Sequence, residues 1–311
     1  MNPTDTHGQN TAPDPVTQAF FDLHHGLPRQ GPGSDATTRR LLEAAGPLPR
    51  RPRVLDAGCG PGRSALLLAR EAKAHVTAVD LHQPFLDQLT DRAARLGLSE
   101  RIVTVNCSMD QLPFPDGSFD VIWAEGAVYT IGFDIALRAW HRLLAPGGVL
   151  VLTEIEWLTA TPSAPARTYW DGAYPLRTGT ANAEAARAAG YRVDAHWPLP
   201  EDDWWDEYYT PLTERIAHAD PARPGMSQAL AALQEEITLR REHGGHYNYA
   251  AYVLHRHNPV HARTNGTPTM TNWITRPETP ADIPAIRDIN LAAFDTPAEA
   301  DLVDALRADP S

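Results

Sequence analysis

Short apolar runs alternate with amphipathic stretches through the middle of this chain. The apolar runs predict buried strands over residues 54–57, 75–79, 102–105, 119–124 and 149–155. The amphipathic stretches predict helices over residues 64–72, 83–96 and 135–144. Strands that alternate with helices through short connections are typical of a parallel sheet covered on both faces.

The same pattern predicts further elements on either side of this core. They are a helix over 37–45, a helix over 181–189, a strand over 191–197, a helix over 227–241 and a strand over 249–256. The expected fold is α/β: a seven-stranded, mostly parallel, doubly wound sheet of the Rossmann-like type with inserted and appended helices.

Composition divides the remainder of the chain. Residues 1–16 are polar and predict a flexible tail, so the main domain is expected over 17–257. Residues 258–272 are rich in Pro, Thr, Asn and Gly and predict a flexible linker. Residues 273–311 begin a separate short α+β piece.

Charge and composition exclude several classes of protein. The 27 basic and 39 acidic residues give a net charge of −12, which disfavours a nucleic-acid partner. No stretch approaches the roughly 18–20 apolar residues that cross a bilayer, and the polar N-terminus does not resemble a signal peptide. Two cysteines cannot form a disulfide framework. A cytoplasmic protein without a membrane partner is expected.

The strongest local signal is the segment Val-Leu-Asp-Ala-Gly-Cys-Gly-Pro-Gly at residues 54–62. A strand that runs into glycines and then into a helix lets a ligand lie close to the backbone. The dinucleotide fingerprint requires G-x-G-x-x-G, whereas the spacing here is G-x-G-x-G and Arg63 occupies the place of the last glycine.

This segment resembles the first motif of the class I S-adenosylmethionine-dependent methyltransferases. Later elements of the same family follow in order: Asp80 at the end of the second strand, Ser108-Met109-Asp110 after the third, Phe119-Asp120-Val121-Ile122 as the fourth, and Leu143 to Gly148 before the fifth. The resemblance implies that the chain binds S-adenosylmethionine and transfers a methyl group to a small-molecule acceptor.

The resemblance also implies a role for each matching position. Gly58, Gly60 and Gly62 are expected under the methionine moiety, and Asp56 near its ammonium group. Asp80, with Leu81 beside it, is expected at the ribose, because a carboxylate accepts two hydroxyls well. Met109 and Asp110 are expected at the adenine. Two alternatives stay open: a cofactor-binding protein without turnover, and a nicotinamide-dependent oxidoreductase.

A narrower resemblance covers residues 18–256. Arg-Gln-Gly-Pro-Gly-Ser at 29–34, Glu-Gly-Ala at 125–127 and late Trp-x-x-x-Tyr elements are similar to a bacterial subgroup of small-molecule methyltransferases. Its substrates are unsettled, so the resemblance leaves the acceptor atom and the oligomeric state open.

Topology indicates where the acceptor site should lie, because ligands of this fold bind outside the carboxyl ends of the strands. Glu125 and Glu154 follow or end such strands, and residues 27–34 are placed to form a lid. If the acceptor must lose a proton, the candidate bases are Glu125, His24 and His25; equally, Glu125 could hold the lid and the histidines could be structural. The expected wall of the acceptor pocket is Trp204, Trp205, Tyr208 and Tyr209, with Trp170 and Tyr174 as further candidates, although these aromatic residues could instead be core.

Two further expectations concern the C-terminal half. The late histidines lack cysteines or clustered acids, so no metal site is expected. Residues 273–311 resemble the opening strand and helix of the GCN5-related N-acetyltransferases, without the later glycine-rich loop. They are interpreted as a truncated second domain that has no acetyltransferase activity, because such a fragment is too small to fold alone.

Overall fold

The computed structural model describes residues 14–257 and, beyond them, only Ile283 and Arg287. The chain divides into one compact unit that ends at Pro259 and a second that begins at Val260. The proposed tail up to residue 13, the linker and the acetyltransferase-like piece lie outside the described residues, apart from Ile283 and Arg287, which are helical. Everything below concerns the first unit.

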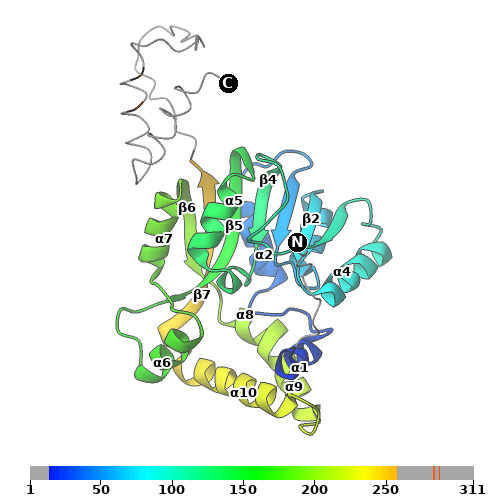
Figure 1. Ribbon diagram of the computed structural model, residues 1–311, viewed down its shortest axis with the longest axis vertical. Coiled ribbons are helices and arrows are strands. Elements are labelled where there is room, and N and C mark those ends of the chain that lie inside the picture. The colour runs from blue at the N-terminus through cyan, green and yellow to red at the C-terminus, as the bar shows by residue number, and fades with distance from the viewer. Residues whose placement is uncertain (1–13, 258–282, 284–286, 288–311) are drawn as a thin grey trace, which may run out of the picture. The chain divides into compact units, whose positions relative to one another are not determined.

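The described part of the first unit is built on one seven-stranded sheet in the order β3-β2-β1-β4-β5-β7-β6 (Figure 1). The strands are β1 (Arg53–Ala57), β2 (His75–Asp80), β3 (Ile102–Asn106), β4 (Phe119–Ala124), β5 (Leu144–Trp157), β6 (Tyr191–Pro198) and β7 (Tyr247–Arg256). All neighbours are parallel except β7, which runs antiparallel to both β5 and β6. The expected mostly parallel α/β fold is confirmed.

Helices cover both faces of the sheet and bury alternate residues of each strand. One face carries α2 (Asp35–Ala44), α3 (Arg63–Glu71) and α4 (Gln83–Arg95), and the other carries α5 (Phe133–His141) and α7 (Gly179–Ala188). In β1, Val54 joins the first core and Leu55 the second, as the two-residue period of a strand requires.

A group of helices lies together beyond one end of the strands (Figure 1). It consists of α1 (Pro15–His24), α6 (Ala164–Ala173), α8 (Asp202–Trp204) with the π-helical turn η2 (Trp205–Tyr209), α9 (Thr210–His218) and α10 (Met226–His243). Within this group α1 packs on α9 and α10, and α6 packs on α10. We call these elements the helical cap.

Most predicted elements are present, with ends shifted by one to three residues, but the cap was largely missed. Asp14 caps α1 by accepting from the amides of Val16 and Thr17, so residues 15 and 16, predicted as part of the tail, belong to a helix. The fifth strand also starts at Leu144 rather than Val149, because residues 144–148 continue as strand instead of forming a turn.

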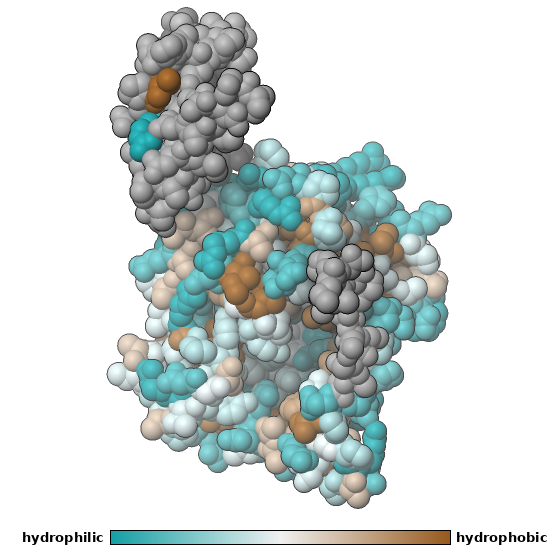
Figure 2. All heavy atoms as spheres, viewed as in Figure 1, coloured by the Kyte–Doolittle hydropathy of each residue, from teal (hydrophilic) through white to brown (hydrophobic). Residues whose placement is uncertain are grey.

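On the face seen in Figure 2 the described surface is mostly hydrophilic.

Candidate active site

A cavity of 770 Å³ lies where the carboxyl ends of β1, β2 and β4 meet the α1–α2 segment. Eight of the predicted site residues line it: His24, Gly58, Gly60, Asp80, Leu81, Met109, Asp110 and Glu125. Its size falls within the range of roughly 300–1,000 Å³ that is usual for sites of small molecules and cofactors.

The glycine loop forms one wall of this cavity, and its packing shows why two of its positions must be glycine. A Cβ atom on Gly58 would lie 2.5 Å from the Ala127 Cβ, so only glycine fits here. Gly62 is not on the cavity: its φ is +81° and a Cβ would lie 2.2 Å from Leu89, at the contact of α3 with α4. Gly62 is thus required by helix packing, and its predicted place under a ligand stays a prediction.

Asp80 stands at the end of β2 with both carboxylate oxygens partly occupied. One oxygen accepts from the Gly60 amide at 2.9 Å and the other from the His82 amide at 2.8 Å. Each carboxylate oxygen has two acceptor sites, so one on each oxygen remains free for a ligand in the cavity. The backbone bonds orient the carboxylate as a two-oxygen acceptor.

The segment that follows β3 supplies a further part of the cavity wall. The Trp140 indole donates to the Met109 carbonyl at 2.7 Å and so holds the backbone that places Met109 and Asp110 on the cavity. The Ser108 hydroxyl donates to the Asp110 carboxylate. Leu81 lines the same region and is 68% exposed, which leaves an apolar surface for a flat ligand.

Asp56 lies on β1 just before the glycine loop and is not itself exposed in the cavity. It is 2% exposed, and its Oδ2 atom has no hydrogen-bond partner among the described residues. Burial, reinforced by the nearby Glu125 and Asp80, raises its pKa to about 8. A buried carboxyl oxygen without a partner is costly, so Asp56 is suited to meet a cation that enters from outside the chain.

The predicted lid is present, and Arg29 fastens it. Residues 28–32 line the cavity, and Arg29 is 6% exposed. Its guanidinium donates to Glu125 and Glu207 at 3.0 Å and to Asp35 at 3.2 Å. Arg63, at the position where a dinucleotide fold carries glycine, pairs with the same Asp35 at 2.7 Å. Three parts of the chain thus converge on one buried cation.

Glu125 is the carboxylate at the centre of this arrangement. Its Oε1 accepts from Thr38 and Trp123 at 2.8 Å and from Ser64 at 3.1 Å, while Oε2 accepts from Arg29. Three donors on Oε1 and the Arg29 guanidinium on Oε2 tie this carboxylate to α2, α3, β4 and the lid. The structure therefore favours Glu125 as the anchor of the lid over Glu125 as a base.

The two candidate histidines differ in position. His24 lines the cavity, bonds the Phe20 carbonyl through Nδ1 at 2.8 Å and faces the Tyr208 hydroxyl at 3.5 Å. Burial lowers its pKa, so it is neutral near pH 7. His25 is exposed at the end of α1 and lies outside the cavity, so its expected catalytic place is wrong.

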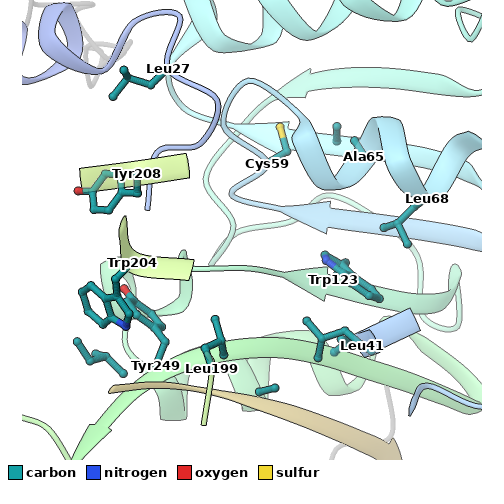
Figure 3. Packing of buried hydrophobic residues seen from close by; sticks show 14 of the residues in the cluster. Leu27, Leu41, Cys59, Ala65, Leu68, Trp123, Leu199, Trp204, Tyr208 and Tyr249 are labelled. Atoms are coloured by element: carbon teal, nitrogen blue, oxygen red, sulfur yellow. The ribbon is translucent and has the colours of Figure 1, made fainter. Parts of the chain in front are cut away.

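The aromatic cluster at 204–209 is mainly core. Trp204 is 2% exposed, packs beside Tyr249 and donates to Asn248 at 2.6 Å (Figure 3). Trp205 is half-buried and donates to Glu201, away from the cavity. The expectation that both tryptophans roof the acceptor pocket is wrong, because the helical cap needs them as its own core. Tyr208 and Tyr209 are buried as well.

The remaining pocket candidates lie behind the cavity wall. Trp170 packs against Tyr247, with ring centroids 5.2 Å apart. Tyr174 lies edge-on to Tyr129, with centroids 6.2 Å apart, and Tyr129 does line the cavity. Glu154 is 2% exposed, its Oε2 has no partner among the described residues, and burial raises its pKa to about 8.

Three residues of this region were missed in the sequence. Arg29 was quoted only as part of a motif, and Tyr129 follows a strand without a distinctive pattern. Glu236 sits on α10 and accepts from the Tyr209 hydroxyl at 2.7 Å, a contact that no local pattern encodes. Among the described residues no trio of His, Cys, Asp and Glu is arranged to hold a metal ion, and no helix could span a membrane.

Residues 54–148 match the family model described as a methyltransferase domain. The chain is 34% identical over 141 residues to the 27-O-demethylrifamycin SV methyltransferase of Amycolatopsis mediterranei, which covers 42% of this chain and 50% of that relative. It is 28% identical to the uncharacterised methyltransferase YodH of Bacillus subtilis, with 73% of this chain and 95% of YodH aligned. The chain spans about half the length of the first of these relatives.

Solved structures share the fold. A methyltransferase from Geobacter sulfurreducens in complex with S-adenosylhomocysteine aligns with a TM-score of 0.66 and 20% identity, over 76% of this chain and 97% of that one. The [4+2]-cyclase SpnF aligns with a TM-score of 0.62 and 24% identity, over 79% and 98% of the two chains. Because one of these proteins is a cyclase, the fold by itself does not determine the reaction.

Proposed function

We propose that this chain, whose residues 54–148 form a methyltransferase domain, transfers a methyl group from S-adenosylmethionine to a small-molecule acceptor. The observation that carries the proposal is the convergence of Gly58, Asp80, Met109 and Asp110 on one cavity, with Gly58 two residues after Asp56, whose Oδ2 has no partner among the described residues. The relatives named as methyltransferases support the same reaction class.

The residues present fit the methyl donor. Asp56 meets its ammonium group, directly or through water, and so gains the partner that the carboxyl lacks. The free acceptor sites of Asp80 take the two ribose hydroxyls, and Leu81 and Met109 cover the faces of the adenine. The donor supplies an activated methyl group and its own leaving group, so the protein's task is alignment and the exclusion of water.

The lid performs the second part of that task. Arg29 and Glu125 hold residues 28–32 over the cavity, where they separate the reacting atoms from bulk water. Arg63 takes part in the same network, in the place where a nicotinamide-binding loop needs glycine. This arrangement supports the methyltransferase over the oxidoreductase alternative.

Calorimetric titration with S-adenosylmethionine, S-adenosylhomocysteine and NAD in parallel tests the proposal. We expect the first two to bind and NAD to give no heat. Release of S-adenosylhomocysteine in the presence of an acceptor then separates an enzyme from a protein that only binds the donor. Binding of NAD in place of both sulfur compounds would overturn the proposal.

A further inference from the structure

The relatives act on chemically different acceptors, so their names do not identify the acceptor here. They include a demethylrifamycin methyltransferase, a dimethylglycine N-methyltransferase and a sterol 24-C-methyltransferase. The structure, however, contains a second cluster of polar side chains next to the cavity. We call it the Tyr–Glu cluster; it consists of Tyr129, Tyr208, Tyr249, Glu154 and Glu236.

Tyr129 connects this cluster with the cavity. It lines the cavity and is 45% exposed, yet protein surrounds it closely enough for burial to raise its pKa. Its ring lies edge-on to Tyr174, with centroids 6.2 Å apart, and Glu154 accepts from the Tyr174 hydroxyl. Separately, Glu236 accepts from Tyr209, whose ring stacks on Tyr208, and Tyr208 faces His24 of the cavity wall. Each carboxyl group, one from β5 and one from α10, is thus linked to the cavity by short chains of contacts.

The place of Glu154 in the sheet agrees with this geometry. Ala124, the last residue of β4, pairs with Leu152 of β5, so Glu154 extends two residues past the end of β4. The Gly126 amide, on the cavity wall, donates to the neighbouring Thr153 at 2.8 Å. Glu154 thus lies at the edge of the sheet where the ligands of this fold bind.

Both carboxyl groups lack a cationic partner. Among the described residues neither Glu154 nor Glu236 forms an ion pair, and the nearby Arg177 is paired with Asp134 at 2.9 Å. Glu154 also leaves its Oε2 atom without a hydrogen bond although it is 2% exposed. Buried carboxylates are normally paired, and tyrosine faces attract organic cations.

We propose that the Tyr–Glu cluster is the acceptor subsite and that it selects an acceptor carrying a basic nitrogen. This proposal rests on the methyltransferase function above. In this proposal the cationic nitrogen lies against the cavity-lining Tyr129, where the carboxyl groups of Glu154 and Glu236 attract it. It supplies the ion-pair partner that neither carboxyl group has among the described residues. Glu154 and Glu236 thereby acquire a role that separates this site from one for neutral alcohols or carbon nucleophiles.

The transfer step balances with these groups alone. The acceptor ammonium gives a proton to the Glu154 carboxylate, which frees the nitrogen lone pair. That lone pair forms the N–C bond to the methyl group while the C–S bond breaks and its electron pair returns to sulfur. The products are the methylated ammonium, S-adenosylhomocysteine and protonated Glu154, which loses its proton to water.

Two probes of equal shape test the subsite. Choline and 3,3-dimethyl-1-butanol differ in a charged nitrogen and a neutral carbon, and each is titrated into the protein saturated with S-adenosylhomocysteine. We expect choline to bind roughly tenfold more tightly. The preference should vanish in Glu154→Gln and Glu236→Gln and persist in Glu242→Gln, a change of an exposed residue on the same helix.

The outcomes separate this inference from the proposed function. If S-adenosylhomocysteine does not bind, both fail. If it binds but the two probes bind equally, or if both Gln variants keep the preference, only the subsite proposal fails. Because Glu154 is buried, its variant is first checked for S-adenosylhomocysteine binding, and Glu236→Gln provides an independent readout should the former not fold.

Methyl transfer itself gives a second arm. The wild-type protein is supplied with S-adenosylmethionine labelled on the methyl group, and with benzylamine or benzyl alcohol at equal concentration. Labelled product from the amine and none from the alcohol supports the inference. Methylation of the alcohol in preference to the amine overturns it while leaving the methyltransferase function intact.

Discussion

Two buried glutamates close to the carboxyl ends of neighbouring strands differ in what surrounds them. Glu125, just after β4, accepts from Thr38, Ser64, Trp123 and Arg29. Glu154, on β5, has an oxygen without any partner among the described residues. Both oxygens of Glu125 accept hydrogen bonds from the chain itself, whereas one oxygen of Glu154 lacks a hydrogen bond among the described residues.

This difference distinguishes a carboxylate that stabilises the fold from one that is available to bind a ligand. A carboxylate that accepts hydrogen bonds on both oxygens, one of them from a buried cation, stabilises the fold without a ligand. An unpartnered one destabilises the empty protein, and a ligand that supplies charge recovers that energy. Asp56 resembles Glu154 in this respect, because one oxygen of each buried carboxyl group has no partner among the described residues. In our proposals the first meets the methyl donor and the second meets the acceptor.

Replacing Glu125 by Gln should have the largest effect, and it should fall on stability. The change leaves the buried Arg29 without one of its three carboxylates and disturbs three further hydrogen bonds. Breaking such a buried pair costs about 3 kcal/mol of unfolding free energy, which denaturant titration measures. Normal stability with reduced turnover would instead make Glu125 a base. Glu71→Gln, which removes an exposed partner of Arg39, is the matched control.

Replacing Glu154 by Gln should leave stability nearly unchanged or raise it, because the buried group then needs no proton to stay neutral. Turnover with an amine should fall by about a hundredfold, the usual scale for the loss of a general base. The affinity for S-adenosylmethionine should not change. Release of S-adenosylhomocysteine gives the rate and calorimetry gives the affinity. Unaltered turnover would contradict the assignment of Glu154 as proton acceptor.

The cavity residues proposed to bind the methyl donor could be predicted from the sequence, because they lie within short local motifs. The glycine loop, Asp80 and Met109-Asp110 each follow a predicted strand, and the parallel sheet brings those strand ends together. The packing role of Gly62 was missed because a glycine that permits ligand approach and one that permits helix packing look the same in a sequence.

The proposed acceptor subsite could not be predicted from the sequence, because its residues come from distant segments that carry no recognisable motif. Trp204 and Trp205 looked like a pocket roof, but an aromatic pair serves equally well as the core of a helical cap. Glu236 lies on α10 and Tyr129 lies between β4 and α5, far apart in the chain, and neither stands in a motif. The composition of the proposed acceptor subsite therefore depends on long-range packing, which local sequence patterns do not encode.

Replacing Asp80 by Ala should weaken the binding of S-adenosylmethionine by more than about tenfold, the cost of losing hydrogen bonds to a charged group. The fold should persist, because the variant loses only the bonds from the amides of Gly60 and His82. Calorimetric titration measures the affinity, and a melting curve checks the fold. An unchanged dissociation constant would remove Asp80 from the ribose site. Asp87→Ala, on the exposed face of α4, is the control.

Asp56 gives the last prediction, a pH dependence whose sign follows from its pKa. Because burial raises the pKa of Asp56 to about 8, the empty protein holds this carboxyl protonated at neutral pH. Stability contributed by the protonated form declines as pH rises from the ordinary value near 3.8 towards 8.

Binding of a cationic ammonium group favours the ionised carboxyl, so S-adenosylmethionine binding should release about one proton near pH 7. Its affinity should then rise with pH between 5.5 and 7, by at most about tenfold per pH unit. Titration in buffers with different heats of ionisation measures the proton release, and Asp56→Asn should abolish it. Equal heats in all buffers for the wild type would show that Asp56 does not receive the ammonium group, and its Oδ2, which has no partner among the described residues, would then need another.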